Sequence, residues 1–122
     1  MNPVNNKKYS WHKISDSLQE ISFSSNGLIQ LEIAGKTICL SIKDNQLSAC
    51  PAKCPHAGGV LADGYIDPLG NIVCPLHRYK FSLKNGRNVS GEGYSLKIFP
   101  VELRQDGVFV GFEQNNFFNW LK

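Results

Sequence analysis

Two short cysteine–histidine clusters constrain this chain more than any other feature of its sequence. The first is Cys54-Pro55-His56 and the second is Cys74-Pro75-Leu76-His77, with seventeen residues between them. Each cluster offers one thiol and one imidazole, and the proline after each cysteine fixes the backbone angle φ and stiffens the loop. Gly58 and Gly59 follow the first cluster, and glycine adopts backbone angles closed to other residues. Such loops suit close wrapping around a metal centre.

The ligand types in the two clusters fit two kinds of metal centre. Tetrahedral zinc accepts two thiolates and two imidazoles, but zinc fingers usually group their cysteines together and their histidines together. Here each loop mixes the two ligand types. Mixing is typical of a 2Fe–2S cluster in which one iron takes both thiolates and the other takes both imidazoles. The pattern favours the 2Fe–2S cluster over a zinc-stabilised interaction module and over ordinary buried cysteines with loop histidines.

Length, composition and charge exclude several other classes of protein. With 122 residues, 42% of them hydrophobic, the chain fits a single domain with a modest core that would gain from a metal. Four cysteines without a secretory signal favour metal binding over disulfides. A net charge of +3 without a run of like charges gives no support for nucleic-acid binding. No apolar stretch is long enough to span a membrane, so we expect a cytoplasmic protein.

Alternating apolar and polar residues predict an all-β fold of the sandwich or barrel type. The alternation runs over residues 29–34 and 37–42, with a turn at Gly35-Lys36, and predicts a hairpin that places Cys39 on its polar face. A second hairpin is predicted around Asp106-Gly107. Pro100 precedes it and indicates an edge or a bulge.

Helical signals are weak and lie near the two ends of the chain. Residues 15–20 could form one helical turn with Ser15 or Asp16 as its cap. Residues 114–121 are predicted to form a short terminal helix. An aromatic segment at this end is expected to fold back over the sandwich or, alternatively, to meet a partner; its members are Phe112, Phe117, Phe118 and Trp120.

The middle of the chain, from about residue 50 to residue 93, is dominated by turn residues and has little apolar content. Burial alone cannot order such a stretch, whereas a metal centre would. We therefore expect a small cluster-binding subdomain at about 50–93, carried on a base sandwich formed by the N- and C-terminal strands.

The chain resembles a Rieske-type 2Fe–2S ferredoxin from about Tyr9 to Phe112. The motifs that carry the resemblance are C-P-H-A-G-G at 54–59, C-P-L-H at 74–77, and F-S-L at 81–83 leading to Asn85-Gly86. The resemblance implies a Rieske fold, with an antiparallel β-sandwich base and a small cluster-binding subdomain. It also implies that Cys54 and Cys74 bind the inner iron, and that His56 and His77 bind the outer iron near the surface.

The same resemblance implies a one-electron carrier that is not itself a catalyst. Such a protein accepts electrons from a flavin-dependent reductase and passes them to a terminal oxygenase. Nothing in the chain resembles a mononuclear iron site of two histidines and a carboxylate. An alternative is the small subunit of an NADH-dependent nitrite reductase-like complex, whose partner would be the large subunit; residues 74–81 and 91–97 carry that similarity.

Differences from high-potential Rieske proteins around the two motifs predict a low reduction potential. High-potential Rieske proteins have a disulfide where this chain has Gly59 and Leu76, and hydroxyl donors where it has Tyr79 and Phe81. With less to stabilise the reduced charge, we expect a value at the low end of the Rieske range of about −150 to +300 mV. Arg78 stands where many similar chains have glycine. Its cation would favour the reduced cluster and could steer an acidic partner, or it is an ordinary solvated side chain.

Charged residues and two further cysteines complete the candidates. Five cations outnumber three carboxylates in the middle of the chain, which fits either a docking face for an acidic partner or an ordinary surface; they are Lys53, Arg78, Lys80, Lys84 and Arg87 against Asp63, Asp67 and Glu92. Cys39 and Cys50 lie outside the ligand pattern and are expected to be free thiols; the alternative is a regulatory disulfide, which depends on their separation in space.

Overall fold

Regular structure in this protein is almost entirely β. The computed structural model describes residues 8–56, 58–91 and 93–114, and the elements below refer to those residues. The strands are β1 Tyr9–Ser15, β2 Leu28–Ile33, β3 Lys36–Lys43, β4 Gln46–Pro51, β5 Tyr65–Ile66, β6 Asn71–Val73, β7 Lys80–Ser82, β8 Val101–Arg104 and β9 Gly107–Glu113. Two 3-10 turns, η2 Leu18–Glu20 and η3 Leu61–Asp63, join them. The predicted all-β class is confirmed.

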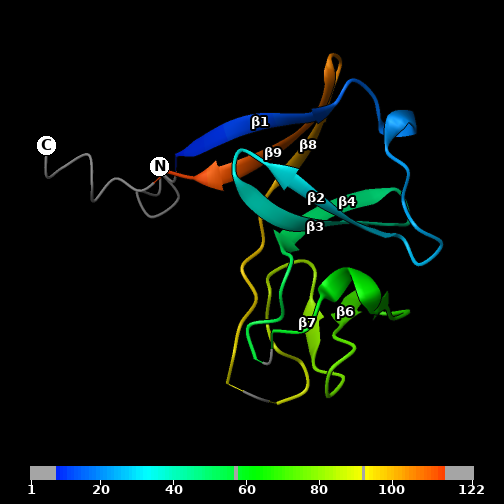
Figure 1. Cartoon of the computed structure of the whole chain (residues 1–122), viewed down its shortest axis with the longest axis vertical. Helices are drawn as coiled ribbons and strands as arrows, with labels where there is room; N and C mark the ends of the chain where they lie inside the picture. The colour runs from blue at the N-terminus through cyan, green and yellow to red at the C-terminus, as the bar shows by residue number, and fades with distance from the viewer. Residues whose placement is uncertain (1–7, 57, 92, 115–122) are drawn as a thin grey trace, which may run out of the picture.

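Two antiparallel sheets form the base of the molecule, in the upper half of Figure 1. One has the strand order β1-β9-β8 and the other β2-β3-β4. Their shared core consists of buried apolar side chains from both sheets and the segment between them: Ile38, Leu40, Ala49, Phe99, Val110 and Phe112. These residues, drawn from both ends of the chain, hold the base together by apolar burial.

Both predicted hairpins are present, and residues with positive φ form the turns at both ends of β3. Ala34 and Gly35 have φ values of 51° and 81°, and Asp44 and Asn45 have values of 52° and 64°. Two consecutive positive φ values make the tight turn whose twist matches that of hairpin strands. The first turn therefore falls at Ala34-Gly35, one residue before the predicted position. β8 starts at Val101, directly after Pro100, and pairs with β9.

The prediction for Cys39 is wrong, because its strand is buried on both faces. β3 lies between β2 and β4, and Ile38 and Leu40 point into the base core. Cys39 on the opposite face is also fully buried, in a second core that includes Leu28. A central strand covered on both sides loses the polar alternation on which the prediction rested.

The second core lies below the base and is covered by the third sheet, β5-β6-β7. Its buried members come from the base and from the loops beneath: Leu28, Cys39, Cys50, Cys54, Leu61, Ile72, Cys74, Phe81 and Leu96. Cys54 and Cys74, the two cysteines of the clusters, thus form part of this core. The apolar packing of the second core therefore fixes where both cluster loops begin.

The loops beneath the base leave it and return to it at one place. The chain departs at the end of β4, and Phe99 then bridges back to Ala49, with the Phe99 N–H donating to the Ala49 carbonyl at 2.8 Å. Residues 52–98 are therefore an excursion between two adjacent points of the base. The subdomain bounds of about 50–93 remain a prediction.

The predicted helical turn near the N-terminus is shorter than expected and begins later. Ser15 belongs to β1, and the 3-10 turn begins at Leu18 with Ser17 at the N-cap position and no side-chain cap bond, so the predicted caps are wrong. The Ser15 hydroxyl instead donates to the Ser17 carbonyl at 2.7 Å. Residues 115–121 of the predicted terminal helix, and the aromatic residues at 117, 118 and 120, lie outside the described residues. Among the residues described, no helix has the length and apolar character needed to cross a membrane.

Candidate metal centre

Each cluster sits on a loop that is pinched at its base by backbone hydrogen bonds. In the first loop the Cys54 N–H donates to the Gly59 carbonyl at 2.8 Å and the Gly58 N–H donates back to Cys54 at 2.9 Å. In the second loop the Cys74 N–H donates to the Tyr79 carbonyl at 2.9 Å. The cysteines therefore lie at the fixed ends of the loops, and the histidines lie nearer the tips.

The second loop turns through two left-handed residues. His77 and Arg78 have φ values of 62° and 57°. A non-glycine residue costs about 1–2 kcal/mol in this conformation, whereas glycine adopts it freely. Glycine in place of Arg78 would relieve this strain.

The two cluster cysteines are buried side by side. Cys54 is 3% exposed and Cys74 is fully buried. Burial raises the pKa of the Cys74 thiol, the Leu76 N–H that faces its sulfur opposes the rise, and the neighbouring Cys54 thiol adds to it. Two adjacent buried thiols need a positive charge between them to exist as thiolates, and a bound metal supplies one.

Gly59 keeps the space beside the Cys74 sulfur open. A Cβ atom at this position would lie 2.9 Å from the Cys74 Sγ and 3.1 Å from the Leu76 Cγ. Those separations are shorter than van der Waals contact. A side chain at residue 59 would therefore require the Cys74 sulfur or the Leu76 side chain to shift.

The two cluster histidines lie together, and one of them has an unused buried nitrogen. The ring centroids of His56 and His77 are 5.5 Å apart, with the rings nearly perpendicular. The Nδ1 atom of His56 is buried and has no hydrogen-bond partner among the described residues. Buried polar atoms are normally satisfied, so a bare ring nitrogen two residues after the buried Cys54 thiol fits a metal ligand. The donor set and this orphaned atom both fit a 2Fe–2S cluster.

Among the described residues, no three side chains of the types His, Cys, Asp and Glu are grouped around a position for one metal ion. A two-iron cluster does not require such a group, because each iron takes two protein ligands and the rest of its coordination comes from sulfide. The two thiols and the two imidazoles form separate pairs here, as that cluster would need.

Two tyrosines surround His56, and sequence reasoning missed their role. The Tyr79 ring stacks on the His56 imidazole with centroids 3.8 Å apart and an angle of 18° between the planes. Tyr94 meets the same imidazole edge-on at 5.5 Å. The available signal was an aromatic residue two positions after His77, but nothing local indicated that Tyr94 would return to the same place.

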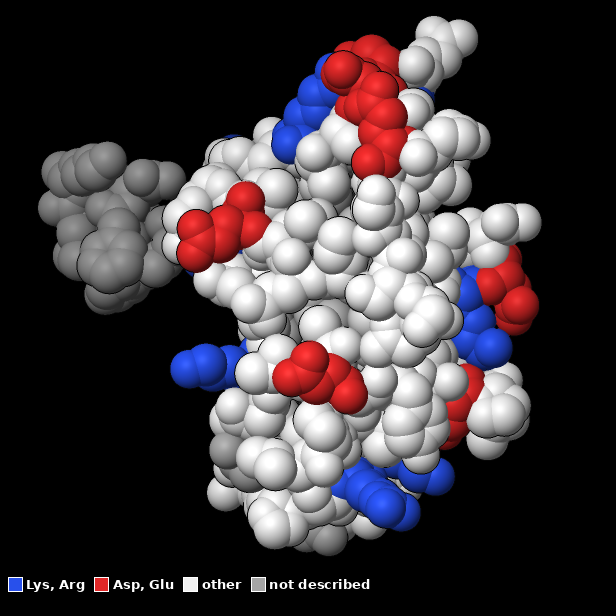
Figure 2. All heavy atoms as spheres, turned by 45° about the vertical axis from the view of Figure 1, so that its right-hand side comes forward, with Lys and Arg blue, Asp and Glu red and all other residues white. Residues whose placement is uncertain are grey.

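The lower part of the molecule carries several exposed lysine and arginine side chains, whereas one of its carboxylates, that of Asp67, is buried and hydrogen-bonded. Figure 2 shows blue side chains at the lower end, and Lys53, Arg78, Lys84 and Arg87 are all exposed. Asp67, by contrast, is buried, and its carboxylate accepts hydrogen bonds from the Leu69 N–H at 3.0 Å and from the Asn71 N–H and Nδ2 at 2.9 and 3.1 Å. Glu92 lies outside the described residues.

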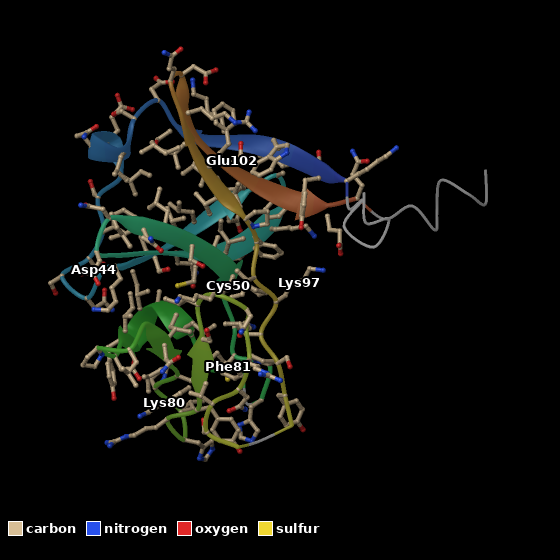
Figure 3. The ribbon with its side chains drawn as sticks, turned by 180° about the vertical axis from the view of Figure 1, so that it is seen from behind. Asp44, Cys50, Lys80, Phe81, Lys97 and Glu102 are labelled. Atoms are coloured by element: carbon tan, nitrogen blue, oxygen red, sulfur yellow. The ribbon has the colours of Figure 1, made fainter. Side chains whose placement is uncertain are left out.

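Cys39 and Cys50 are free thiols, as predicted. They are directly opposite each other on β3 and β4, with the Cys50 Sγ 3.8 Å from the Cys39 carbonyl oxygen. Contact with Cys39 and burial both raise the pKa of Cys50. Figure 3 shows Cys50 where the base meets the loops beneath it, above Phe81. We assign these cysteines to core packing.

Comparisons with known proteins agree with this geometry. Residues 10–100 match the sequence model of the Rieske [2Fe-2S] domain. The ferredoxin component of an alkene monooxygenase system from Xanthobacter autotrophicus is 23% identical over 82 residues, which are 67% of this chain and 67% of that protein.

Two solved structures show the same fold. A complex of reduced oxygenase and oxidised ferredoxin in carbazole 1,9a-dioxygenase contains a chain with 22% identity and a TM-score of 0.71, over 86% of this chain and 95% of that one. A chain described as an NADH-dependent nitrite reductase small subunit from Mycobacterium tuberculosis has 16% identity and a TM-score of 0.74, over 88% of this chain and 99% of that one.

Proposed function

The chain belongs to the Rieske 2Fe–2S domain family, and from that premise we propose that it is a one-electron carrier rather than a catalyst. The observation that carries the proposal is the pair of adjacent buried thiols, Cys54 and Cys74, together with the buried Nδ1 of His56, which has no hydrogen-bond partner among the described residues. His77, the other imidazole, is exposed. This arrangement suits a redox centre that is enclosed on one side and reachable on the other.

We propose the ligand set Cys54 and Cys74 for the inner iron and His56 and His77 for the outer iron. When bound, the cluster supplies reversible uptake of one electron. Neutral imidazoles leave the oxidised centre uncharged, two units less negative than four thiolates would make it, which favours reduction. Because Cys54 and Cys74 are buried, water does not reach their sulfur atoms. Tyr79 fixes the orientation of the His56 ring by stacking on it.

Oxygenase ferredoxins among the relatives support the choice of partner. The alkene monooxygenase ferredoxin component is similar to this chain in sequence, and an oxygenase–ferredoxin complex contains the same fold. We therefore propose electron transfer from a flavin-dependent reductase to a terminal oxygenase, in the cytoplasm. The nitrite reductase small subunit is a weaker candidate, because it rests on a fold likeness at 16% identity.

Electron paramagnetic resonance of the reduced protein tests the proposal. We expect an iron–sulfur signal from the reconstituted chain, and its loss in His56→Ala and in His77→Ala. His12→Ala is the matched control, because His12 lies on β1 against Phe112, in the base. Absence of a signal from the unmodified chain would refute the proposal, and a colourless zinc-loaded protein would identify the interaction module instead.

The reduction potential distinguishes this subtype within the family. Phe81, which stands where high-potential proteins have a hydroxyl donor, is fully buried and apolar. We expect a midpoint at the low end of the range of about −150 to +300 mV. A midpoint above about +100 mV on the same scale would contradict the assignment to the low-potential class.

A further inference from the structure

Among the described residues, two buried side-chain polar atoms have no hydrogen-bond partner, and both lie in the loops beneath the base. One is the Nδ1 of His56, which the proposed cluster accounts for. The other is the Nδ2 of Asn88, an amide nitrogen that carries two N–H donors. Buried donors are normally satisfied, because each one left unpaired costs free energy. The Asn88 amide therefore needs an acceptor that the described residues do not supply.

The orientation of the Asn88 amide is fixed by its own oxygen. The Oδ1 atom accepts the Ser90 N–H at 2.9 Å and closes a turn between the two residues. Exchange of the two ends of the amide would place one N–H donor against another. The Nδ2 is therefore the end that lacks a partner.

Backbone pairing turns the Asn88 side chain toward the second core. Asn88 lies opposite Phe81 in an antiparallel bridge, which is flanked on each side by a backbone hydrogen bond of 2.9 Å between the neighbouring residues. Two residues opposite each other in such a bridge point to the same face, with their side chains close together. Phe81 is fully buried in the second core, in the loops below Cys50 in Figure 3. The Asn88 amide is thus directed to the same core.

The second core offers this amide few acceptors other than sulfur. Its buried side chains are hydrocarbon except for those of four cysteines. Cys74 follows Ile72, the partner of Phe81, by two positions and so shares its face of the strand. No cysteine sulfur among the described residues accepts a bond from Asn88. The inorganic sulfide of a 2Fe–2S cluster held by Cys54 and Cys74 is an acceptor that the protein alone lacks.

We propose that the Asn88 amide donates a hydrogen bond to a sulfide of the bound cluster and thereby raises its reduction potential. Reduction adds negative charge to the centre, so that an N–H donor binds its sulfur more strongly in the reduced state. Asn88 is in this role a supporting residue that contacts the cluster without binding iron. This inference rests on the proposed electron-carrier function.

Matched serine variants of two asparagines test the proposal. Asn85 closes the same kind of turn, with its Oδ1 accepting the Arg87 N–H at 2.8 Å, but its side chain is exposed. Serine at either position is uncharged and keeps an oxygen for the turn, while the amide donor is removed. Asn88→Ser and Asn85→Ser therefore differ in whether the lost donor faces the second core.

The first quantity measured is the midpoint potential of the reconstituted protein, titrated against a dye of known potential. We expect Asn88→Ser to lower the equilibrium constant for reduction about 3- to 10-fold, from the loss of one hydrogen bond to a charged acceptor. Asn85→Ser should change that constant less than about twofold, because an exposed amide is solvated by water in both redox states.

Electron–nuclear double resonance supplies a second readout that a purely structural role would not move. Spectra of the reduced protein in water and in deuterium oxide reveal exchangeable protons close to the cluster. Asn88→Ser should lose one such proton coupling, which Asn85→Ser should retain. Retention of every coupling in Asn88→Ser, or equal midpoint potentials in the two variants, would overturn the inference while the proposed function stands. A chain that never assembles a reducible cluster would overturn both.

Discussion

The base of the molecule and the loops beneath it are ordered by different forces. In the base, two sheets enclose an apolar core that includes Ile38, Leu40 and Val110. The loops contain short strands such as β6, of three residues, and are held largely by hydrogen-bonded turns. Asn26, for example, reaches down from the base to donate to the carbonyls of Ala62 and Gly64 at 3.0 and 2.9 Å. The expectation that burial alone could not order the loops is therefore only partly right: they share an apolar core that includes Leu61, Ile72 and Phe81, and polar contacts and the cluster add to it.

The largest expected difference between the regions follows removal of a cysteine ligand. Cys74→Ser should abolish the iron–sulfur signal and leave residues 52–98 without the cluster that orders them. Hydrogen exchange of their amides should then quicken about 100-fold or more, while β3 and β9 keep their protection. Cys39→Ser, which changes a cysteine outside the proposed ligand set, is the control and should retain the signal. Equal loss of protection in both regions would contradict the comparison.

Cavities in the two cores should separate cluster retention from overall stability. Phe81→Ala in the loop core should reduce the free energy of unfolding by about 3–5 kcal/mol, and Leu40→Ala in the base core by about 2–5 kcal/mol. Both side chains are fully buried. Only Phe81→Ala should shorten the lifetime of the cluster in a chelator, followed by loss of visible absorbance. Equal cluster lifetimes in the two variants would show that the second core, which contains Phe81, does not support the site.

A polar contact in the loops should give a smaller, pH-dependent effect. Burial would raise the pKa of Asp67, but hydrogen bonds from Asn71 and Leu69 and the charge of Lys80 together lower it. A lowered pKa stabilises the fold above the unfolded value of about 3.9, and that stability is lost as the pH falls through the folded value.

Asp67→Asn should therefore cost about 1–3 kcal/mol at neutral pH, because one hydrogen bond becomes a clash of donors. It should also flatten the decline in stability below about pH 4. Chemical denaturation across pH measures both quantities, with the exposed Asp63→Asn as the control. If the free energy of unfolding of Asp67→Asn falls below pH 4 as it does in the unmodified protein, this carboxylate does not contribute to the stability of the loops.

The smallest expected effect is a gain in stability at the loop tip. Arg78→Gly relieves a left-handed residue with φ of 57° and should raise the free energy of unfolding by about 1 kcal/mol. The same change should lower the midpoint potential slightly, because a cation near the cluster is lost. Arg87→Gly, at an exposed loop residue without positive φ, should not stabilise the protein. Loss of stability in Arg78→Gly would show that the guanidinium makes an internal contact.

Local patterns in the sequence predicted the parts of the fold that depend on neighbouring residues. Alternation and turn residues identified the hairpins on either side of Ala34-Gly35 and before β9. The burial of Cys39 was missed, because it depends on a second core assembled from residues far along the chain, such as Phe81 and Leu96. A pattern of one residue in, one residue out cannot reveal that both faces of a strand are covered.

In the candidate site, too, the local features could be predicted from the sequence and the long-range contacts could not. Its four proposed ligands were visible as two local motifs, and the two loops bring Cys54 and Cys74 together. The aromatic cover of His56 was not visible, because Tyr79 and Tyr94 reach it from different loops. The unequal exposure of the two imidazoles is therefore a property of the folded chain alone.

The bridge between Ala49 and Phe99 has a consequence for how this architecture can change. Because the chain leaves and re-enters the base at adjacent points, the excursion is one continuous insertion in the sequence of the base. The base nevertheless contributes Leu28, Cys39 and Cys50 to the second core. A different segment joined at these two points would therefore also have to cover the lower face of β3.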